Sequence, residues 1–379
     1  MKIGILTFHC AHNYGAVLQC YALQETLKQM GHDVEVIDYR PQYLLTPYNI
    51  FNKRRILSKN PIFVIKSCIR EMLLLAARIK RYNAFDKFIK NRLNLSDRVM
   101  ERKIPNGYDV YIMGSDQIWN PKITQGFDPV YFGYFDFKKS KRKYISYAAS
   151  TEAKMLNAET KNFYIKALSN FDAVSVRETK LAELLKPLTS KKIGTVLDPT
   201  LIADRSIWNS IIRKPNIKHK YVLVYQVRNN ENTMRIASEI ANQIKAVVIE
   251  VTAWLNVYFR KNRLQCASPE EFLGLVKNAA CVVTTSFHGT AFSIIFNRPF
   301  YCIQLGDGGD TRAQSLLKQT GLSERMINKN LTPDFTEINY DDGINKCLSD
   351  LRKESLRYLC DNIKLKDEKS SNFSHCSCL

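Results

Sequence analysis

The chain has 379 residues, of which 45% are hydrophobic and 24% are charged, values typical of globular proteins that bury a sizeable core. Its 56 Lys and Arg exceed its 36 Asp and Glu, which gives a formal net charge of +20. Only 15 glycines and 12 prolines are present, which excludes a collagenous or low-complexity chain.

Strands and helices are expected to alternate along the first half of the chain. Apolar patterns predict strands at Lys2–Phe8, Asp33–Tyr39, Asp109–Met113, Tyr144–Ala148, Ala173–Val176 and Thr195–Leu197. The segment Ala16–Met30 predicts a helix, because its apolar residues recur at helical spacing and Gly31 suits a C-terminal cap. This βαβ opening favours a parallel sheet covered by helices.

A second α/β unit follows a connection at residues 191–220 that contains Pro199 and Pro215. Strands are predicted at Tyr221–Val227, Ala246–Val251, Cys281–Thr285 and Phe300–Ile303, and helices at Asn232–Ile244, Thr290–Phe296 and Tyr340–Ile363. Ser268, Pro269 and Glu271 predict a further helix start, with Ser as the N-cap. Residues 364–379 are polar and are expected to fray.

The element order predicts two Rossmann-like α/β lobes of the GT-B type, with a basic helical insertion in the first lobe. We expect the N-terminal lobe at 1–198, the C-terminal lobe at 199–345, and a C-terminal helix and tail at 346–379. In such folds ligands bind in the cleft, outside the carboxyl ends of the strands. The loops that follow the predicted strands are therefore the candidate functional segments.

The charge is concentrated in one segment. Residues 53–103 hold 15 Lys or Arg and four acids, a net charge of +11 (15 minus 4). Ile62, Ile65, Ile69 and Met72 interleave with these charges at near-helical spacing. Such a helix could lie on an anionic membrane surface, or it could pack on its own lobe with a solvated charged face. Both interpretations remain open at this stage.

Other partners and compartments are less well supported. No zinc finger, RRM signature or helix-turn-helix pattern accompanies the basic charge, so we expect no nucleic-acid partner. The ten cysteines show no regular spacing, which favours free thiols in a reducing compartment. Without a signal peptide or a convincing membrane span, we expect a cytoplasmic protein, peripheral at the inner face of the membrane if residues 53–103 bind lipid.

Two loops of the first lobe carry polar side chains toward the expected cleft. Asn13 and Gly15 lie between the first strand and its helix, whose N-terminal N–H groups form a natural anion site. Asp116, Gln117 and Trp119 follow a later strand, and an exposed Trp at such a place indicates a ligand.

Three further segments carry candidate donors and acids. Arg177 leaves a strand end and could hold a carboxylate or phosphate, although the motif alone favours a surface pair with Glu178. His288 lies at a strand-to-helix turn, where a histidine can act as a general acid or bind phosphate. Arg312 ends a Gly-rich loop at another helix start.

The ordered motifs resemble the polysaccharide pyruvyl transferase family. They are NYGAVLQCYAL, GSDQIWN, SVRE, LDPTL, SFHG followed by an apolar helix and NRPF, and a Gly/Asp loop with Arg312, running from about Ile3 to Arg325. The resemblance implies a GT-B-like enzyme that moves the pyruvyl group of phosphoenolpyruvate onto two hydroxyls of a sugar and releases phosphate. The implied product is a cyclic pyruvate ketal on a lipid-linked or polymeric glycan, such as a capsular precursor. The resemblance implies phosphoenolpyruvate as co-substrate, with no metal and no other cofactor.

The resemblance also implies roles for particular residues. The catalytic candidates are His288, as proton donor to the enol carbon, and Asp116, as base or positioning group for a sugar hydroxyl. The donor-binding candidates are Arg177, Ser286, Gly289, Thr290 and Arg312. The acceptor-binding candidates are Asn13, Tyr14, Gly15, Gln117 and Trp119.

One position departs from the family pattern. Many members carry Arg two residues before the motif His, where this chain has Ser286. A donor-binding cation would then come from elsewhere, with Arg312 and Arg298 as candidates. Two alternative functions of the protein stay open: a GT-B glycosyltransferase that uses a nucleotide sugar, and a non-catalytic protein that binds an anionic glycan.

Overall fold

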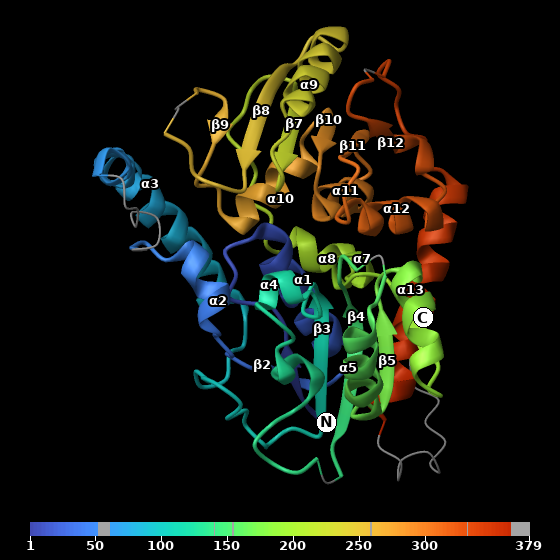
Figure 1. The fold of residues 1–379 in the computed structure, drawn as a ribbon. Coiled ribbons are helices and arrows are strands. Elements are labelled where there is room, and N and C mark those ends of the chain that lie inside the picture. The colour runs from blue at the N-terminus through green and yellow to red at the C-terminus, as the bar shows by residue number, and fades with distance from the viewer. Residues whose placement is uncertain (52–60, 140, 154, 258–259, 332, 365–379) are drawn as a thin grey trace.

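The computed structural model describes residues 1–51, 61–139, 141–153, 155–257, 260–331 and 333–364. These residues form two α/β lobes, each built on a six-stranded parallel sheet (Figure 1). The expected tail beyond Lys364 and the first part of the basic segment, residues 53–60, lie outside the described residues.

The first lobe holds the sheet β2-β1-β3-β4-β5-β6. Its strands are β1 (Lys2–Leu6), β2 (Asp33–Val36), β3 (Val110–Asp116), β4 (Lys143–Ala149), β5 (Ala173–Val176) and β6 (Ile193–Thr195). Residues of β3 and β5 are buried throughout, as parallel strands covered on both faces require.

The second lobe holds the sheet β12-β11-β10-β7-β8-β9. Its strands are β7 (Tyr221–Gln226), β8 (Val247–Thr252), β9 (Arg263–Leu264), β10 (Cys281–Thr284), β11 (Phe300–Gln304) and β12 (Met326–Asn328). The expected lobe boundary after residue 198 falls in the connection between β6 and β7.

Helices cover both sheets. The α-helices are α1 (Tyr14–Gln29), α2 (Gln42–Leu45), α3 (Pro61–Arg92), α4 (Pro121–Thr124), α5 (Ala158–Ser169), α6 (Thr179–Leu185), α7 (Pro199–Ile202), α8 (Arg205–Asn209), α9 (Glu231–Gln243), α10 (Pro269–Lys277), α11 (Phe287–Ile295), α12 (Asp310–Gln319) and α13 (Asp342–Ile363). Short 3₁₀ turns lie at Thr46–Tyr48, Pro129–Phe132, Lys186–Leu188 and Ser323–Arg325. The expected start of α10 is confirmed, because the side chains of Ser268 and Glu271 form a reciprocal capping box.

The strand order places a switch point in each lobe. In the first sheet the chain moves from β1 outward to β2 and then back to β3 on the other side. In the second sheet β8 and β10 flank β7 in the same way. Ligands in open parallel sheets bind at such points, outside the carboxyl ends of the strands. Here the two switch points face each other across the gap between the lobes (Figure 1).

The last helix returns to the first lobe (Figure 1). Tyr358 of α13 donates a hydrogen bond to the Ser146 carbonyl of β4 at 3.0 Å. The Ser355 hydroxyl accepts from the buried Leu197 N–H at 2.9 Å. Two Rossmann-like lobes joined by a short connection, with a C-terminal helix that crosses back, constitute the expected GT-B-like fold.

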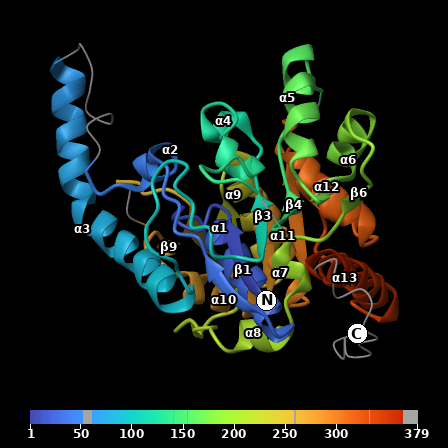
Figure 2. The same cartoon turned by 90° about the horizontal axis from the view of Figure 1, so that it is seen from below.

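The basic segment forms α3, which has two different halves. The half that ends at Arg92 packs on the molecule through Phe85, Phe88 and Ile89. The half that begins at Pro61 projects away from both sheets (Figures 1 and 2). The segment therefore packs on the molecule only in part.

Other expectations need correction at element ends. The helix α11 begins at Phe287 rather than at Thr290, so His288 lies in its first turn. The short edge strands β9 and β12 were not anticipated, since two or three residues carry no readable period. Among the described residues, no helix combines the length and apolar character needed to cross a membrane.

Candidate active site

A cavity of about 310 Å³ lies between the two switch points. Its walls come from both lobes, and both contribute polar side chains. The first lobe supplies Asn13, Asp116, Gln117 and Glu152, and the second supplies Arg228, Ser286, His288 and Arg312. We call this cavity the interlobe cleft.

The start of α1 brings the first lobe against His288. The Asn13 side chain caps the helix by accepting from the N–H groups of Gly15 at 2.9 Å and Ala16 at 3.3 Å. A Cβ at Gly15 would overlap the imidazole ring of His288. Only glycine leaves room for this approach, which explains the residue type at position 15.

The start of α11 positions His288 from the other side. Ser286 is the N-cap, with its hydroxyl 3.5 Å from the Gly289 N–H and its carbonyl bonded by the Thr290 hydroxyl at 3.2 Å. Gly289 packs so closely on Thr284 that a Cβ would overlap its side chain. Gly289 and Thr290 therefore shape the helix start that carries His288.

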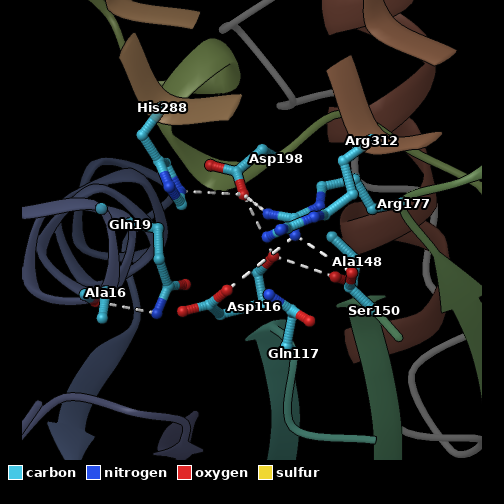
Figure 3. A network of polar contacts seen from close by, with 12 residues as sticks. Ala16, Gln19, Asp116, Gln117, Ala148, Ser150, Arg177, Asp198, His288 and Arg312 are labelled. Carbon is cyan, nitrogen blue, oxygen red and sulfur yellow. Dashed lines mark hydrogen bonds and ion pairs between the residues drawn. The ribbon is translucent and has the colours of Figure 1, made fainter. Parts of the chain in front are cut away.

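A buried carboxylate, Asp198, lies behind His288 (Figure 3). Its Oδ2 accepts from Nη1 of Arg177 at 2.6 Å and from the Ser115 hydroxyl at 3.3 Å. The same oxygen lies 3.7 Å from Nε2 of His288, an ion-pair distance rather than a hydrogen bond. Nε2 has no hydrogen-bond partner among the described residues.

The surroundings keep Asp198 ionised. Burial alone would raise the pKa of this carboxyl, but His288, Arg177 and the Thr200 N–H together lower it well below its usual range. The ionised carboxylate therefore provides a counter-charge 3.7 Å from Nε2 for a protonated His288.

Arg177 is held inside the first lobe rather than in the cleft. In addition to Asp198 it contacts Glu178 at 3.4 Å and donates to the Ser150 hydroxyl at 3.0 Å. Its guanidinium also covers the ring of Phe287 at 4.3 Å. It is 4% exposed and is not among the residues that line the cleft. The expected direct grip of Arg177 on a donor needs correction, because its donors are already used by carboxylates.

Arg312 lines the cleft from the second lobe together with Arg228, and it lies beside Arg177 (Figure 3). It contacts Glu152 of the first lobe at 3.3 Å. Burial and the charge of Arg177 lower its pKa, while Asp116 and Glu152 oppose that shift. Its Nε has no hydrogen-bond partner among the described residues. A buried donor of this kind favours an anionic ligand in the cleft.

The remaining predicted residues fall into two groups. Asn13, Asp116, Gln117, Ser286, His288 and Arg312 line the cleft together. Tyr14, Gly15, Gly289, Thr290, Arg177 and Trp119 do not line it. The second proposed cation source, Arg298, donates to the Phe296 carbonyl at 3.0 Å and is also absent from the cleft lining.

Trp119 and Tyr14 take structural positions instead of contacting an acceptor. The Trp119 indole is fully buried, stacks on Phe132, and donates to the Tyr131 carbonyl at 3.1 Å. Tyr14 donates to the Ala267 carbonyl at 2.8 Å and so ties α1 to the second lobe. The chain itself buries Trp119, so this side chain needs no ligand to cover it.

Several lining or supporting residues were not singled out from the sequence. Asp198 belongs to the LDPTL motif, but the motif itself indicates no role for it. Arg228 follows β7 at the second switch point. Trp254 follows β8 and lines the cleft as well. Positions directly after strands could have indicated Arg228 and Trp254, whereas the role of Asp198 depends on contacts far apart in the chain. Among the described residues, no cluster of three or more His, Cys, Asp or Glu side chains is arranged to hold a metal ion.

The close approach of Gly15 to His288 makes a specific prediction. Gly→Ala within a helix ordinarily stabilises by about 1 kcal/mol. Gly15→Ala is instead expected to destabilise by about 1–3 kcal/mol, because the new methyl group must displace the imidazole. Urea unfolding measures the stability, and the ¹H–¹⁵N imidazole signals of His288 report its displacement.

Gly107→Ala is the control, since a Cβ at that position meets no atom within 4 Å. If Gly15→Ala proved as stable as Gly107→Ala and left the His288 signals in place, the described packing between the lobes would be incorrect.

Comparison with known proteins identifies the family. A model of the polysaccharide pyruvyl transferase family matches residues 13–306, which is most of the chain. No curated protein sequence matches the chain.

Solved structures give only distant likenesses. A putative UDP-N-acetylglucosamine 2-epimerase from Listeria monocytogenes is 12% identical with a TM-score of 0.45, over 98% of this chain and 91% of that one. MnaA from S. aureus, solved with UDP, is 12% identical with a TM-score of 0.46, over 98% and 99% of the two chains. UGT89C1 from Arabidopsis thaliana is 10% identical with a TM-score of 0.43, over 94% of each chain. The account of the fold therefore rests on the two sheets themselves.

The family match covers the motifs around Asn13, Asp116, Arg177, Asp198 and His288, which the structure gathers at the junction of the lobes. The chain belongs to the polysaccharide pyruvyl transferase family.

Proposed function

We propose that the protein transfers the pyruvyl group of phosphoenolpyruvate onto two hydroxyls of a sugar in a cell-surface polysaccharide precursor. The products are a cyclic pyruvate ketal and phosphate, and phosphoenolpyruvate is a co-substrate with no further cofactor. One observation carries the proposal beyond family membership. In the interlobe cleft, Arg312, His288 and the Asp116 carboxylate line one cavity, and the ionised Asp198 lies 3.7 Å behind His288.

Arg312 is the proposed cation for the donor. Phosphoenolpyruvate carries a carboxylate and a phosphate on three carbons, so its binding site needs cationic donors. Ser286 replaces the frequent family Arg with a neutral helix cap, and Arg312 places a guanidinium on the same cavity. Arg228 also lines the cleft, and it is paired with Asp307 and Asp310.

His288 is the proposed proton donor. Protonation of the methylene carbon of phosphoenolpyruvate makes the neighbouring carbon electrophilic, and a sugar hydroxyl then bonds to that carbon. The bond to the phosphate oxygen breaks next, and the second hydroxyl takes its place. Of the two hydroxyl protons released, one replaces the proton given to the methyl group and the other leaves with phosphate. The ionised Asp198 beside His288 supports this role, because it complements the imidazolium that gives the proton.

Asp116 is the proposed base for the acceptor. It ends β3 at the first switch point and lines the cleft with Asn13 and Gln117. A carboxylate there can accept a hydroxyl proton, and the Asn13 amide nitrogen can donate to a neighbouring hydroxyl while its oxygen caps α1.

A turnover assay tests the proposal. The acceptor is supplied as the lipid-linked glycan fraction of cells from which this protein has been deleted. We expect the enzyme and phosphoenolpyruvate to increase the mass of a glycan by that of pyruvic acid less one water molecule. One phosphate should be released for each ketal formed, as measured by mass spectrometry and a phosphate assay. His288→Gln should lower kcat by roughly 100-fold or more.

His219→Gln is the matched control, because His219 is exposed and outside the cleft. Melting curves establish that both variants fold. Phosphate release without a change in glycan mass, or equal activity of the two variants, would contradict the proposed reaction.

We further propose that the enzyme works at the inner face of the membrane, where a lipid-linked acceptor is held. The support comes from the projecting half of α3. Six large apolar side chains there are 48–70% exposed: Ile62, Phe63, Ile65, Ile69, Met72 and Leu73. The same stretch carries the exposed bases Lys66, Arg70 and Lys80. Exposed apolar side chains beside cationic groups suit an anionic bilayer.

Vesicle flotation tests this surface. Wild type is expected to float with vesicles that contain phosphatidylglycerol and to bind neutral phosphatidylcholine vesicles weakly. The triple variant Ile65→Gln, Ile69→Gln and Met72→Gln should reduce the bound fraction about tenfold or more, because it removes apolar area from the interface.

The pair Ile165→Gln and Leu331→Gln serves as the control, since both side chains are exposed elsewhere on the molecule. Equal binding to anionic and neutral vesicles, or an unaffected triple variant, would contradict the proposal that α3 binds the membrane. Neither result would bear on the proposed reaction.

A further inference from the structure

A second cavity, of about 490 Å³, adjoins the interlobe cleft between α3 and the loop after β8. Tyr48 and Trp254 line both cavities, so the two spaces share a wall. Their rings stack with centroids 5.9 Å apart and planes only 2° apart. We call this space the α3 pocket.

The α3 pocket carries an excess of positive charge. Arg70, Arg78 and Arg81 line it, whereas Glu71 is the one acid among the described residues of its lining. Glu71 lies 2.8 Å from Arg78 and 3.6 Å from Arg70. His12 also lines the pocket, but burial and the charge of Arg81 lower its pKa to about 4, so it is neutral at pH 7. Three guanidinium groups against one carboxylate favour an anionic ligand.

Arg81 fixes the base of the pocket. Its Nη1 donates to the carbonyls of Thr252 at 3.0 Å and Gln265 at 2.8 Å, which joins α3 to the second lobe. The residue is 7% exposed, and its Nη2 has no hydrogen-bond partner among the described residues. The pocket is thus built on a buried cation with one donor unused.

Trp254 gives the shared wall an accessible aromatic face. Its side chain is 48% exposed, whereas the other two tryptophans, Trp119 and Trp208, are fully buried. An exposed aromatic ring beside polar groups is a surface on which a sugar ring can stack. The wall between the two cavities therefore suits the saccharide part of a ligand.

The outer side of the pocket borders an exposed apolar side chain of α3. Arg70 lines the pocket, and Leu73, one helical turn along, is exposed to solvent, whereas Ile65, Ile69 and Met72 lie on the opposite face of the helix. From the interlobe cleft outward, the molecule presents an aromatic wall and then arginines, with the exposed Leu73 beside Arg70. A lipid-linked glycan has sugar, diphosphate and lipid in that same order.

We propose that the α3 pocket binds the diphosphate of a lipid-linked glycan, whose sugar extends past Trp254 into the interlobe cleft and whose lipid leaves the pocket beside Leu73. This inference rests on the proposed function for the class of acceptor. The arginines supply charge-assisted hydrogen bonds to the diphosphate, which position the acceptor independently of the donor.

Trp254 provides a direct reporter, because Trp119 and Trp208 are buried. Farnesyl diphosphate is the probe, with farnesol and inorganic pyrophosphate as separate arms, and no phosphoenolpyruvate is present. We expect a saturable change in tryptophan emission with farnesyl diphosphate, a weaker one with pyrophosphate, and none with farnesol. The change should be absent in Trp254→Phe.

Arg70→Gln tests the charge, since its side chain is largely exposed and its loss should leave the fold intact. We expect it to raise the Kd of farnesyl diphosphate about tenfold. Lys87→Gln removes the same charge from the same helix outside the pocket and should leave the Kd unchanged. An unchanged emission with farnesyl diphosphate, an equal response to farnesol, or equal effects of the two substitutions would overturn the inference. Because the assay involves no turnover, failure of pyruvyl transfer would be seen separately.

Discussion

The buried ion pair between Asp198 and Arg177 is the contact on which the interlobe cleft depends. One oxygen of Asp198 accepts from Arg177 at 2.6 Å and lies 3.7 Å from His288 of the other lobe. The other oxygen caps α7 through the Thr200 N–H at 3.0 Å. Removing one partner of such a buried pair costs about 3–5 kcal/mol, since the other charge is left without compensation. Because the carboxylates of the first lobe bind Arg177 internally, the guanidinium groups that line the cleft are those of Arg228 and Arg312 in the second lobe.

Much of the fold could be predicted from the sequence, because local patterns specify its regular parts. The apolar runs of β1, β3 and β7 and the capping box of α10 are visible in the chain, and the βαβ rule then orients the sheets. The helix α11 begins at Phe287, before Thr290, and the Thr290 hydroxyl donates to the carbonyl of the N-cap Ser286 one turn earlier. Edge strands such as β9 depend on pairing with β8, which no local pattern shows.

The candidate site could be predicted only in part. Position after a strand indicated Asp116 and His288, and both line the cleft. Sequence could not separate Arg177 from Arg312, because two carboxylates around Arg177, Asp116 and Asp198, come from other segments of the chain. The burial of Trp119 could not be predicted either. Its ring is covered by the turn at Pro129–Phe132, and the motif around Trp119 does not indicate that contact.

Ligand-induced thermal stabilisation tests most directly the claim that the cleft binds phosphoenolpyruvate. Phosphoenolpyruvate, UDP, GDP and inorganic phosphate are compared on wild type, Arg312→Gln, and the exposed control Arg213→Gln. At about 100 times its Kd, a ligand stabilises the native state by roughly 2.7 kcal/mol, which a melting curve resolves. The account predicts a rise in Tm with phosphoenolpyruvate that Arg312→Gln abolishes and Arg213→Gln preserves. A rise with UDP or GDP and none with phosphoenolpyruvate would contradict it and would indicate a nucleotide-sugar enzyme.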